Sequence, residues 1–167
     1  MASDDINYDF FENETRKHQQ MVSKFLIRFS QLLLERAVTH DASKLEEPER
    51  GTFAKVTPLL KGLTFGSPEY KAQADEMGPA LTHHYAHNRH HPEYFRENKS
   101  QHQDLGSPIL CMNLVDIVEM VCDWIAATKR HNNGSIAKSI EVQKKRFDLS
   151  EQFCQWMRNT LSSIEDI

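Results

Sequence analysis

Apolar residues recur every three or four positions through most of the chain, a spacing that predicts helices. The clearest case is residues 5–37, where one stripe of the helix is apolar. That stripe consists of Met21, Val22, Phe25, Leu26, Phe29, Leu32 and Leu33. We expect this helix to turn the stripe toward a core and to be capped by Asp4 or Asp5. His18 extends the stripe by one turn, so we expect it to point inward too.

Prolines, glycines and small polar residues divide the rest of the chain into further helices. The predicted helices cover residues 47–61, Ser67 to Gly78, Pro79 to about His91, Ile109 to about His131, a segment after the Asn132–Gly134 turn that Ser135 caps, and a last segment that Ser150 caps. No segment alternates strictly between apolar and polar residues, as a strand would. We therefore predict an all-α fold, a compact single-domain helical bundle of six or seven helices spanning residues 1–167.

The composition is that of an ordinary soluble protein and restricts the classes of function. Hydrophobic residues make up 39% of the chain and charged residues 26%. A formal net charge of -4 argues against nucleic acid as the main partner. Cys111, Cys122 and Cys154 form neither a disulfide framework nor a zinc pattern, which indicates a reducing compartment. Neither a long apolar run nor a signal peptide is recognisable, so we predict a cytoplasmic protein without a membrane partner.

Histidines are concentrated in one short stretch. Five of the nine lie between positions 83 and 91, namely His83, His84, His87, His90 and His91. On a helix with roughly 100° per residue, these five fall within an arc of about 120°, with Asn88 at its edge. Such a face is a poor core, because every buried imidazole needs a hydrogen-bond partner. Binding of a metal ion would give the face a use, whereas the alternative is a set of solvated or structural histidines.

A second concentration of polar residues lies in the predicted helix from Ile109. Asp116 and Asp123 are seven residues apart, about 20° from each other around the axis, and Glu119 lies within about 60° of both. Their neighbours on this helix are apolar. Buried carboxylates require cations or histidines opposite them, so we expect this stripe to face such groups unless it is simply exposed to solvent.

The adjacent pair His40-Asp41 supplies a third set of candidate ligands. Neighbouring side chains can bind one ion only where the helix is distorted or where both wrap around the ion. Imidazole nitrogen and carboxylate oxygen suit a divalent ion of Mn, Mg, Co, Zn, Ni or Fe. We predict one or two such ions as cofactors.

In order along the chain, these residues resemble the HD-domain superfamily of all-helical, metal-dependent phosphohydrolases. In that superfamily a histidine, a His-Asp pair and a distant aspartate bind one metal, and two-metal members add histidines between them. The sequence His-Asp-Ala-Ser at 40–43 looks like the motif of bacterial 5'-deoxynucleotidases and phage dATP triphosphohydrolases. More closely, HDxSK at 40–44 with HHxxxNxHHxEY at 83–94 resembles a small phage and bacterial family of unknown function, over about residues 15–130.

The resemblance implies a set of metal ligands. The first ion would be held by His18, His40, Asp41 and Asp123, and a second by His84 with His90 or His91. Asp116 is the rival of Asp123 as the last ligand. Lys44 stands where the deoxynucleotidases have a catalytic glutamate. Glu47 or Glu49 would replace that glutamate from the next turn, or Lys44 would contact a phosphate.

We therefore predict a phosphohydrolase that acts on a nucleotide or a similar small phosphate ester through a metal-activated water. Asp41, Lys44 and Glu47 are the candidate catalytic residues. The candidate substrate contacts are Lys44, His87, Asn88, Arg89, Arg96, Asp116 and Glu119. The alternatives are a di-iron oxygenase and a non-catalytic phage protein that sequesters a metal or nucleotide. We also predict a homo-oligomer, because the chain has more aromatic surface than one small core needs, in Phe10, Phe11, Tyr94, Phe95 and Trp156-Met157.

Overall fold

The computed structural model of the chain describes residues 7–64, 67–98, 105–130 and 134–164. Within these ranges every regular element is a helix and no strand occurs, which confirms the all-α prediction. The elements are α1 (Tyr8–Thr39), η1 (Ala42–Leu45), α2 (Glu49–Leu60), α3 (Pro68–Asp75), α4 (Gly78–His87), α5 (Pro92–Glu97), η3 (Pro108–Cys111), α6 (Leu114–Lys129), α7 (Ile136–Phe147) and α8 (Glu151–Ile164). The predicted cap at Asp4 or Asp5 and the Asn132–Asn133 part of the predicted turn lie outside the described residues.

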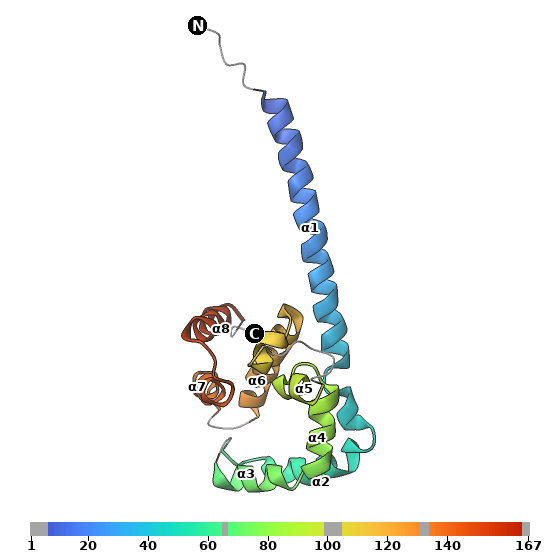
Figure 1. Cartoon of the computed structure of the whole chain (residues 1–167), viewed down its shortest axis with the longest axis vertical. Coiled ribbons are helices and arrows are strands. Elements are labelled where there is room, and N and C mark those ends of the chain that lie inside the picture. Colours follow the sequence, from blue (N-terminus) through green and yellow to red (C-terminus); the bar gives the residue numbers. More distant parts are fainter. Residues whose placement is uncertain (1–6, 65–66, 99–104, 131–133, 165–167) are drawn as a thin grey trace. The chain divides into compact units, whose positions relative to one another are not determined.

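The chain divides into two units, residues 1–38 and residues 39–167. The first consists of α1, which is a single uninterrupted helix (Figure 1). The helix itself was predicted; described by itself, it buries none of its residues, and Met21 and Phe25 are 51% and 69% exposed. The spacing of apolar residues determines which side of a helix is apolar, but it does not determine what covers that side.

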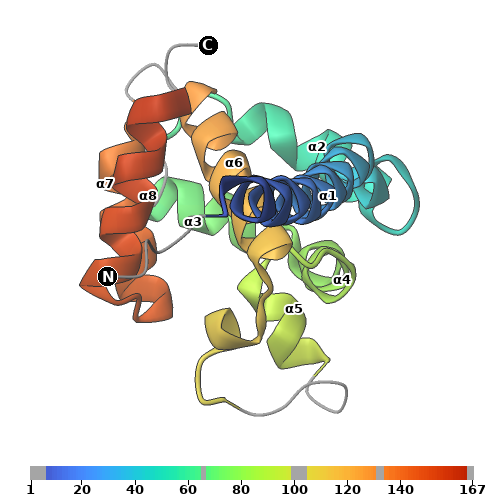
Figure 2. The same cartoon turned by 90° about the horizontal axis from the view of Figure 1, so that it is seen from above.

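The core of the second unit lies among the helices of its C-terminal part. α7 and α8 lie side by side, and α6 contacts α7 (Figures 1 and 2). α8 places Cys154, Met157 and Leu161 into this core from one face. Trp124 of α6 and Phe147 of α7 stack with nearly parallel rings, their centroids 6.5 Å apart. Burial of each large apolar side chain contributes about 1.5–3 kcal/mol, so this core provides the frame on which α6 presents its acidic residues.

The histidine-rich segment is a helix followed by a turn, whereas one continuous helix was predicted. α4 ends at His87, and Asn88 then has the extended backbone angles φ -116° and ψ 107°. His91 is also extended, because the ring of Pro92 disfavours helical geometry in the residue before it. His90 and His91 therefore leave the chain from a turn, and the predicted arc of five histidines on one helix is wrong.

The predicted helix from Ile109 is also interrupted. The short helix η3 ends at Cys111, and α6 starts at Leu114 after Asn113. Asn113 accepts a hydrogen bond from the backbone N–H of Asp116, and the Asp116 carboxylate accepts one from the backbone N–H of Asn113. This capping box fixes the start of α6 and occupies Asp116.

Other predicted helix starts are confirmed. Ser67, Ser135 and Ser150 each accept a backbone N–H bond from the residue three positions later. None of the described helices combines the length and the apolar character that a helix needs to cross a membrane.

Candidate metal centre

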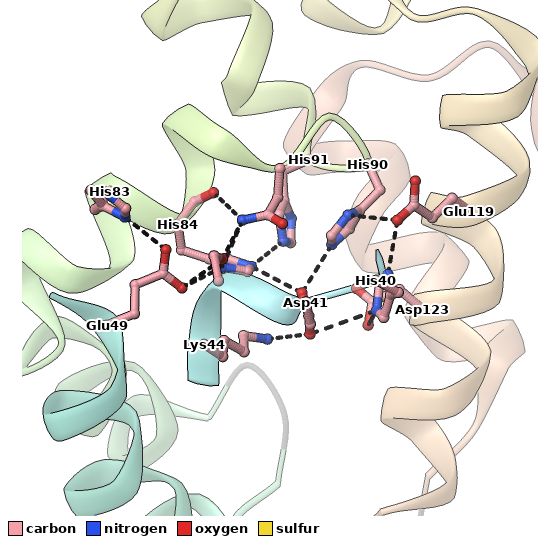
Figure 3. A network of polar contacts seen from close by, with 12 residues as sticks. His40, Asp41, Lys44, Glu49, His83, His84, His90, His91, Glu119 and Asp123 are labelled. Atoms are coloured by element: carbon pink, nitrogen blue, oxygen red, sulfur yellow. Dashed lines mark hydrogen bonds and ion pairs between the residues drawn. The ribbon is translucent and has the colours of Figure 1, made fainter. Parts of the chain in front are cut away.

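His40 and Asp41 lie where α1 gives way to η1. α1 ends at Thr39, and Asp41 adopts the left-handed backbone angles φ 57° and ψ 13°. Aspartate tolerates this region better than most residues, at a modest energetic cost. The reversal replaces the helical path between the two residues, so their side chains both face the same cluster (Figure 3). This is the local distortion that a His-Asp pair needs to serve one site.

The Asp41 carboxylate lies at the middle of the cluster. Its Oδ1 is 3.2 Å from Nε2 of His84 and 3.4 Å from Nε2 of His90. Its Oδ2 is 2.5 Å from Nζ of Lys44 and 3.6 Å from Nε2 of His40. The two oxygens therefore face two different sets of neighbours.

One set joins Asp41 with His84, His90 and His91. Each residue offers one ligand atom, and all four atoms lie within 4.8 Å of one another. Nε2 of His84 is 2.9 Å from Nε2 of His91. Ligands about 2.1 Å from an ion are separated by about 3.4 Å in a tetrahedron and about 3.0 Å in an octahedron. The spacing of these atoms therefore fits ligands around a single ion.

The other side of Asp41 offers two further groups that could hold an ion. One consists of His40, Asp41 and Asp123, with Nε2 of His40 3.7 Å from Oδ1 of Asp123. The second joins His40, His90 and Glu119. Because Asp41 belongs to groups on both of its sides, its carboxylate can bridge two neighbouring ion positions.

Two glutamates orient the imidazole rings. Glu49 lies 2.9 Å from Nδ1 of His84, and Glu119 lies 2.9 Å from Nδ1 of His40 and 3.2 Å from Nδ1 of His90. An ionised carboxylate only accepts hydrogen bonds, so these Nδ1 atoms carry the protons. In each neutral ring the lone pair then lies on Nε2, which is the atom that faces Asp41 (Figure 3). Carboxylates that orient ligating histidines in this way are common around metals.

This arrangement leaves electron-rich atoms facing one another. Oδ1 of Asp41 and Nε2 of His90 are buried, and neither has a hydrogen-bond partner. Buried polar atoms without partners are costly. A positive charge among them, either a proton on a ring or a metal ion, removes that cost. The buried residues therefore form groups that could hold a metal ion.

The local electrostatics also favour binding of a cation. Contacts with Asp123 and Glu119 raise the pKa of His40 to about 10. Burial alone would raise the pKa of Asp41, but its contacts with His84, His90 and Lys44 hold that pKa well below its usual range. Asp41 is consequently ionised at neutral pH, as a metal ligand must be.

His91 differs from the other rings of the cluster. Burial and the neighbouring His90 and His84 hold its pKa well below the usual value. His91 is therefore a neutral imidazole at pH 7, the form in which histidine binds metals.

A buried polar layer supports the cluster from the side of α2. Glu49 is completely buried and, besides His84, contacts Nδ1 of His83 at 2.7 Å. Ser43 donates to Glu49 at 3.0 Å, and Asn88 donates to Ser43 at 2.8 Å. These bonds connect the HDxSK segment to the histidine-rich turn. The sequence suggested Glu49 only as a replacement catalytic acid, and no spacing rule could have identified its contact with His84.

Arg89 and Asp116 contact each other and form a structural pair. Nε and Nη2 of Arg89 donate to the two carboxylate oxygens of Asp116 at 3.1 and 2.8 Å. The guanidinium also lies 5.3 Å from the ring centre of Tyr94 and 5.1 Å from that of Phe95. Both charges were predicted to contact substrate, but the structure places them in a bond between the histidine turn and the start of α6.

Three other predicted residues have exposed side chains. His87 stacks on His83 with ring centres 3.9 Å apart, Arg96 lies on α5, and Glu47 precedes α2. None of them belongs to the groups that could hold an ion among the described residues.

His18 is exposed on α1 and belongs to none of the ion-holding groups found in the described part of the chain. It lies 21 residues before Thr39, which corresponds to about 32 Å along a continuous helix.

Comparison with known proteins identifies a family but no activity. No curated protein matches the chain. No solved structure matches it. One family model matches residues 7–163, which is nearly the whole chain. The chain belongs to DUF5662, a family of unknown function.

Proposed function

We propose that this protein is a metal-dependent phosphohydrolase that acts on a nucleotide or a similar small phosphate ester. The observation that carries the proposal is the position of the Asp41 carboxylate between two groups of ligands, with Oδ1 3.2 Å from His84 and Oδ2 3.6 Å from His40. A carboxylate shared in this way is typical of sites with two metal ions, many of which cleave phosphate esters. The resemblance of the ligand order to the HD-domain superfamily supports the same reaction.

Each of the two groups of ligands would hold one ion. Asp41, His84, His90 and His91 would hold one ion, and His40, Asp41 and Asp123 a second. A divalent ion in such a site supplies hydroxide at neutral pH and polarises a phosphoryl oxygen. Among the candidate metals, Mn, Fe, Co, Ni and Zn suit three imidazoles better than Mg does.

The exposure of the side chains indicates the side from which a substrate would enter. His84 and His90 are 2% exposed, whereas Asp123, Lys44 and His40 are 22%, 28% and 30% exposed. A phosphate would therefore approach from the side of the latter three. Lys44 offers the positive charge there and would stabilise charge that develops on the phosphoryl oxygens.

The test is a screen for phosphate release from nucleotides and simple phosphate esters, with the full chain loaded with Mn, Co, Zn or Mg. We expect activity that disappears in Asp41→Asn and persists in Asp75→Asn, a matched aspartate at the end of α3 that lies outside the ion-holding groups of the described residues. Absence of phosphate release from every substrate by metal-loaded protein would overturn the proposal.

Two other functions use the same cluster. Its richness in imidazole suits iron, so a di-iron oxygenase is the second candidate. An iron-to-protein ratio near two, with the absorption band of an oxo-bridged pair, would favour it. Lys44, in the position of a catalytic acid, favours a non-catalytic binder of nucleotide or metal. Retention of ligand without product would distinguish that function.

A further inference from the structure

The apolar face of α1 is too large to be left in water. Phe11, Phe25 and Leu26 are 64%, 69% and 63% exposed, and no residue of the helix is buried. With roughly 100° per residue, these side chains fall on one side of the helix together with Met21 and Val22. Large contiguous apolar patches on soluble proteins mark interaction sites.

The second unit of the same chain is shorter than α1, so part of the helix extends beyond it. The 32 residues of α1 extend for about 48 Å. A compact unit of the size of residues 39–167 has a radius of gyration of about 14 Å and hence a diameter of about 36 Å. Whatever angle α1 makes with it, the helix is longer than that diameter by about two turns.

The charges on α1 are segregated along its length. Its N-terminal part carries three acidic residues, Asp9, Glu12 and Glu14. The next part carries four basic residues, Arg16, Lys17, Lys24 and Arg28. Two copies aligned in parallel would place like charges together. A staggered antiparallel pair instead places the acidic part of each helix beside the basic part of the other, and charge complementarity of this kind selects orientation.

We propose that α1 is a dimerisation element that binds the α1 helix of a second copy of this chain. The two helices run antiparallel and cross near His18. Phe11 then lies opposite Phe25 of the other copy, and residues 9–14 lie beside residues 22–27, which include Lys24. Phe11, His18 and Phe25 share one side of the helix. The pairing is isologous, since the same surface is used on both chains.

Two intrahelical ion pairs are compatible with this arrangement. Arg16 contacts Glu12 at 2.8 Å, and Lys17 contacts Glu14 at 2.7 Å. All four side chains are at least half exposed, and such pairs contribute little to stability. Their charges remain available to a second helix, and this inference does not depend on the proposed hydrolase activity.

The first test is sedimentation equilibrium of the full chain between about 1 and 100 μM. We expect a dimer that weakens as salt is raised from about 50 to 500 mM. Phe11→Glu and Phe25→Glu should each raise the dissociation constant at least about tenfold while circular dichroism shows the helix content retained. Leu34→Ser is the matched control, because Leu34 is 66% exposed on the opposite side of α1. A wild type that stays monomeric, or a dimer that both glutamate variants leave unchanged, would overturn the proposal.

The second test fixes the orientation, in a Cys122→Ser background that removes the exposed native thiol. The antiparallel pair predicts that Phe11→Cys combined with Phe25→Cys gives a disulfide-linked dimer on mild oxidation, whereas Leu34→Cys does not. Efficient cross-linking of Phe11→Cys alone would indicate a parallel pair and contradict the assignment.

Discussion

The two units of this protein depart from the usual distribution of residues in opposite ways. α1 exposes large apolar side chains along its length, and none of its residues is buried. The cluster around Asp41 instead buries polar residues, with Glu49 fully buried and His84 and His90 nearly so. Exposed apolar area and buried unpaired polar atoms are both unfavourable.

Each region is therefore incomplete without a partner, and the two partners differ in kind. The face of α1 requires another apolar surface. The cluster requires positive charge, because Oδ1 of Asp41 and Nε2 of His90 lack hydrogen-bond partners.

Substitution of Asp41 should have the largest effect of all, and it should affect only the function of the Asp41 cluster. We expect Asp41→Asn to lower phosphate release at least about 1000-fold, since the carboxylate contacts both groups of ligands. Chelation of the wild type should likewise lower its melting temperature, because an ion present at about 1000 times its Kd contributes about 4 kcal/mol. Calorimetry with and without EDTA measures this. An identical melting temperature in both conditions would contradict the prediction.

Breaking the pair of Arg89 with Asp116 should destabilise the second unit. Arg89→Met leaves the fully buried Asp116 carboxylate without its guanidinium partner. We expect a loss of about 2–4 kcal/mol of unfolding free energy, less than for a completely buried pair, because the Arg89 side chain is itself 31% exposed. Urea denaturation gives the value. The control is Arg158→Met, whose partners Glu141 and Glu151 are exposed, so its loss should be at most about 1 kcal/mol.

The pH dependence of stability should change sign when metal is bound. His40 has a pKa of about 10 in the metal-free fold, raised from its ordinary value of 6.5. Its protonated form therefore stabilises the metal-free protein fully below pH 6.5, and this stabilisation, on the order of 3 kcal/mol, is lost as the pH rises toward 10. A bound ion requires neutral His40, so metal-loaded protein should gain stability over that range. Denaturation curves from about pH 6 to 10 measure how stability depends on pH with and without metal. His40→Gln should abolish the pH dependence of the metal-free protein.

Substitution of Glu49 should lower the affinity for metal without abolishing metal binding. Glu49→Gln weakens the contact that holds Nδ1 of His84, and loss of such an orienting group costs about 10- to 100-fold in affinity. Titration calorimetry with Zn²⁺ or Mn²⁺ gives the ratio. Glu47→Gln, two residues earlier and exposed, is the matched control and should leave the affinity unchanged.

Disruption of the capping box of α6 should have the smallest effect on stability. Asn113→Ala removes the acceptor for the backbone N–H of Asp116 and should cost about 1 kcal/mol of unfolding free energy. Affinity for metal should change less than about twofold, because α6 keeps Glu119 and Asp123 on its later turns.

Local rules predicted the helices and many of their ends. Ser67, Ser135 and Ser150 start helices as expected, because a serine cap depends only on its nearest neighbours. The predictions failed where two local signals competed. A helical pattern of histidines continued past His87, but Pro92 and the extended Asn88 interrupted it. The capping box of Asn113 similarly divided the predicted helix from Ile109.

Contacts between residues far apart in the chain limited how much of the site could be predicted from the sequence. The residues His40, Asp41, His84, His90, His91 and Asp123 were named from the sequence, and the structure brings them together. The orientation of the rings by Glu49 and Glu119 depends on contacts 35 and 79 residues apart in the chain, which no spacing rule specifies. The same limit applies to α1, because a sequence pattern identifies its apolar side but not what covers that side.

Elemental analysis of the purified full chain tests most directly whether the Asp41 cluster holds metal. We expect one or two equivalents of a transition metal per chain after dialysis against Mn, Fe, Co, Ni or Zn. Asp41→Asn should retain less than about a tenth of that metal, while Asp75→Asn should retain all of it. Wild-type protein that holds no metal after such loading, or an Asp41→Asn variant that holds as much as the wild type, would contradict this assignment.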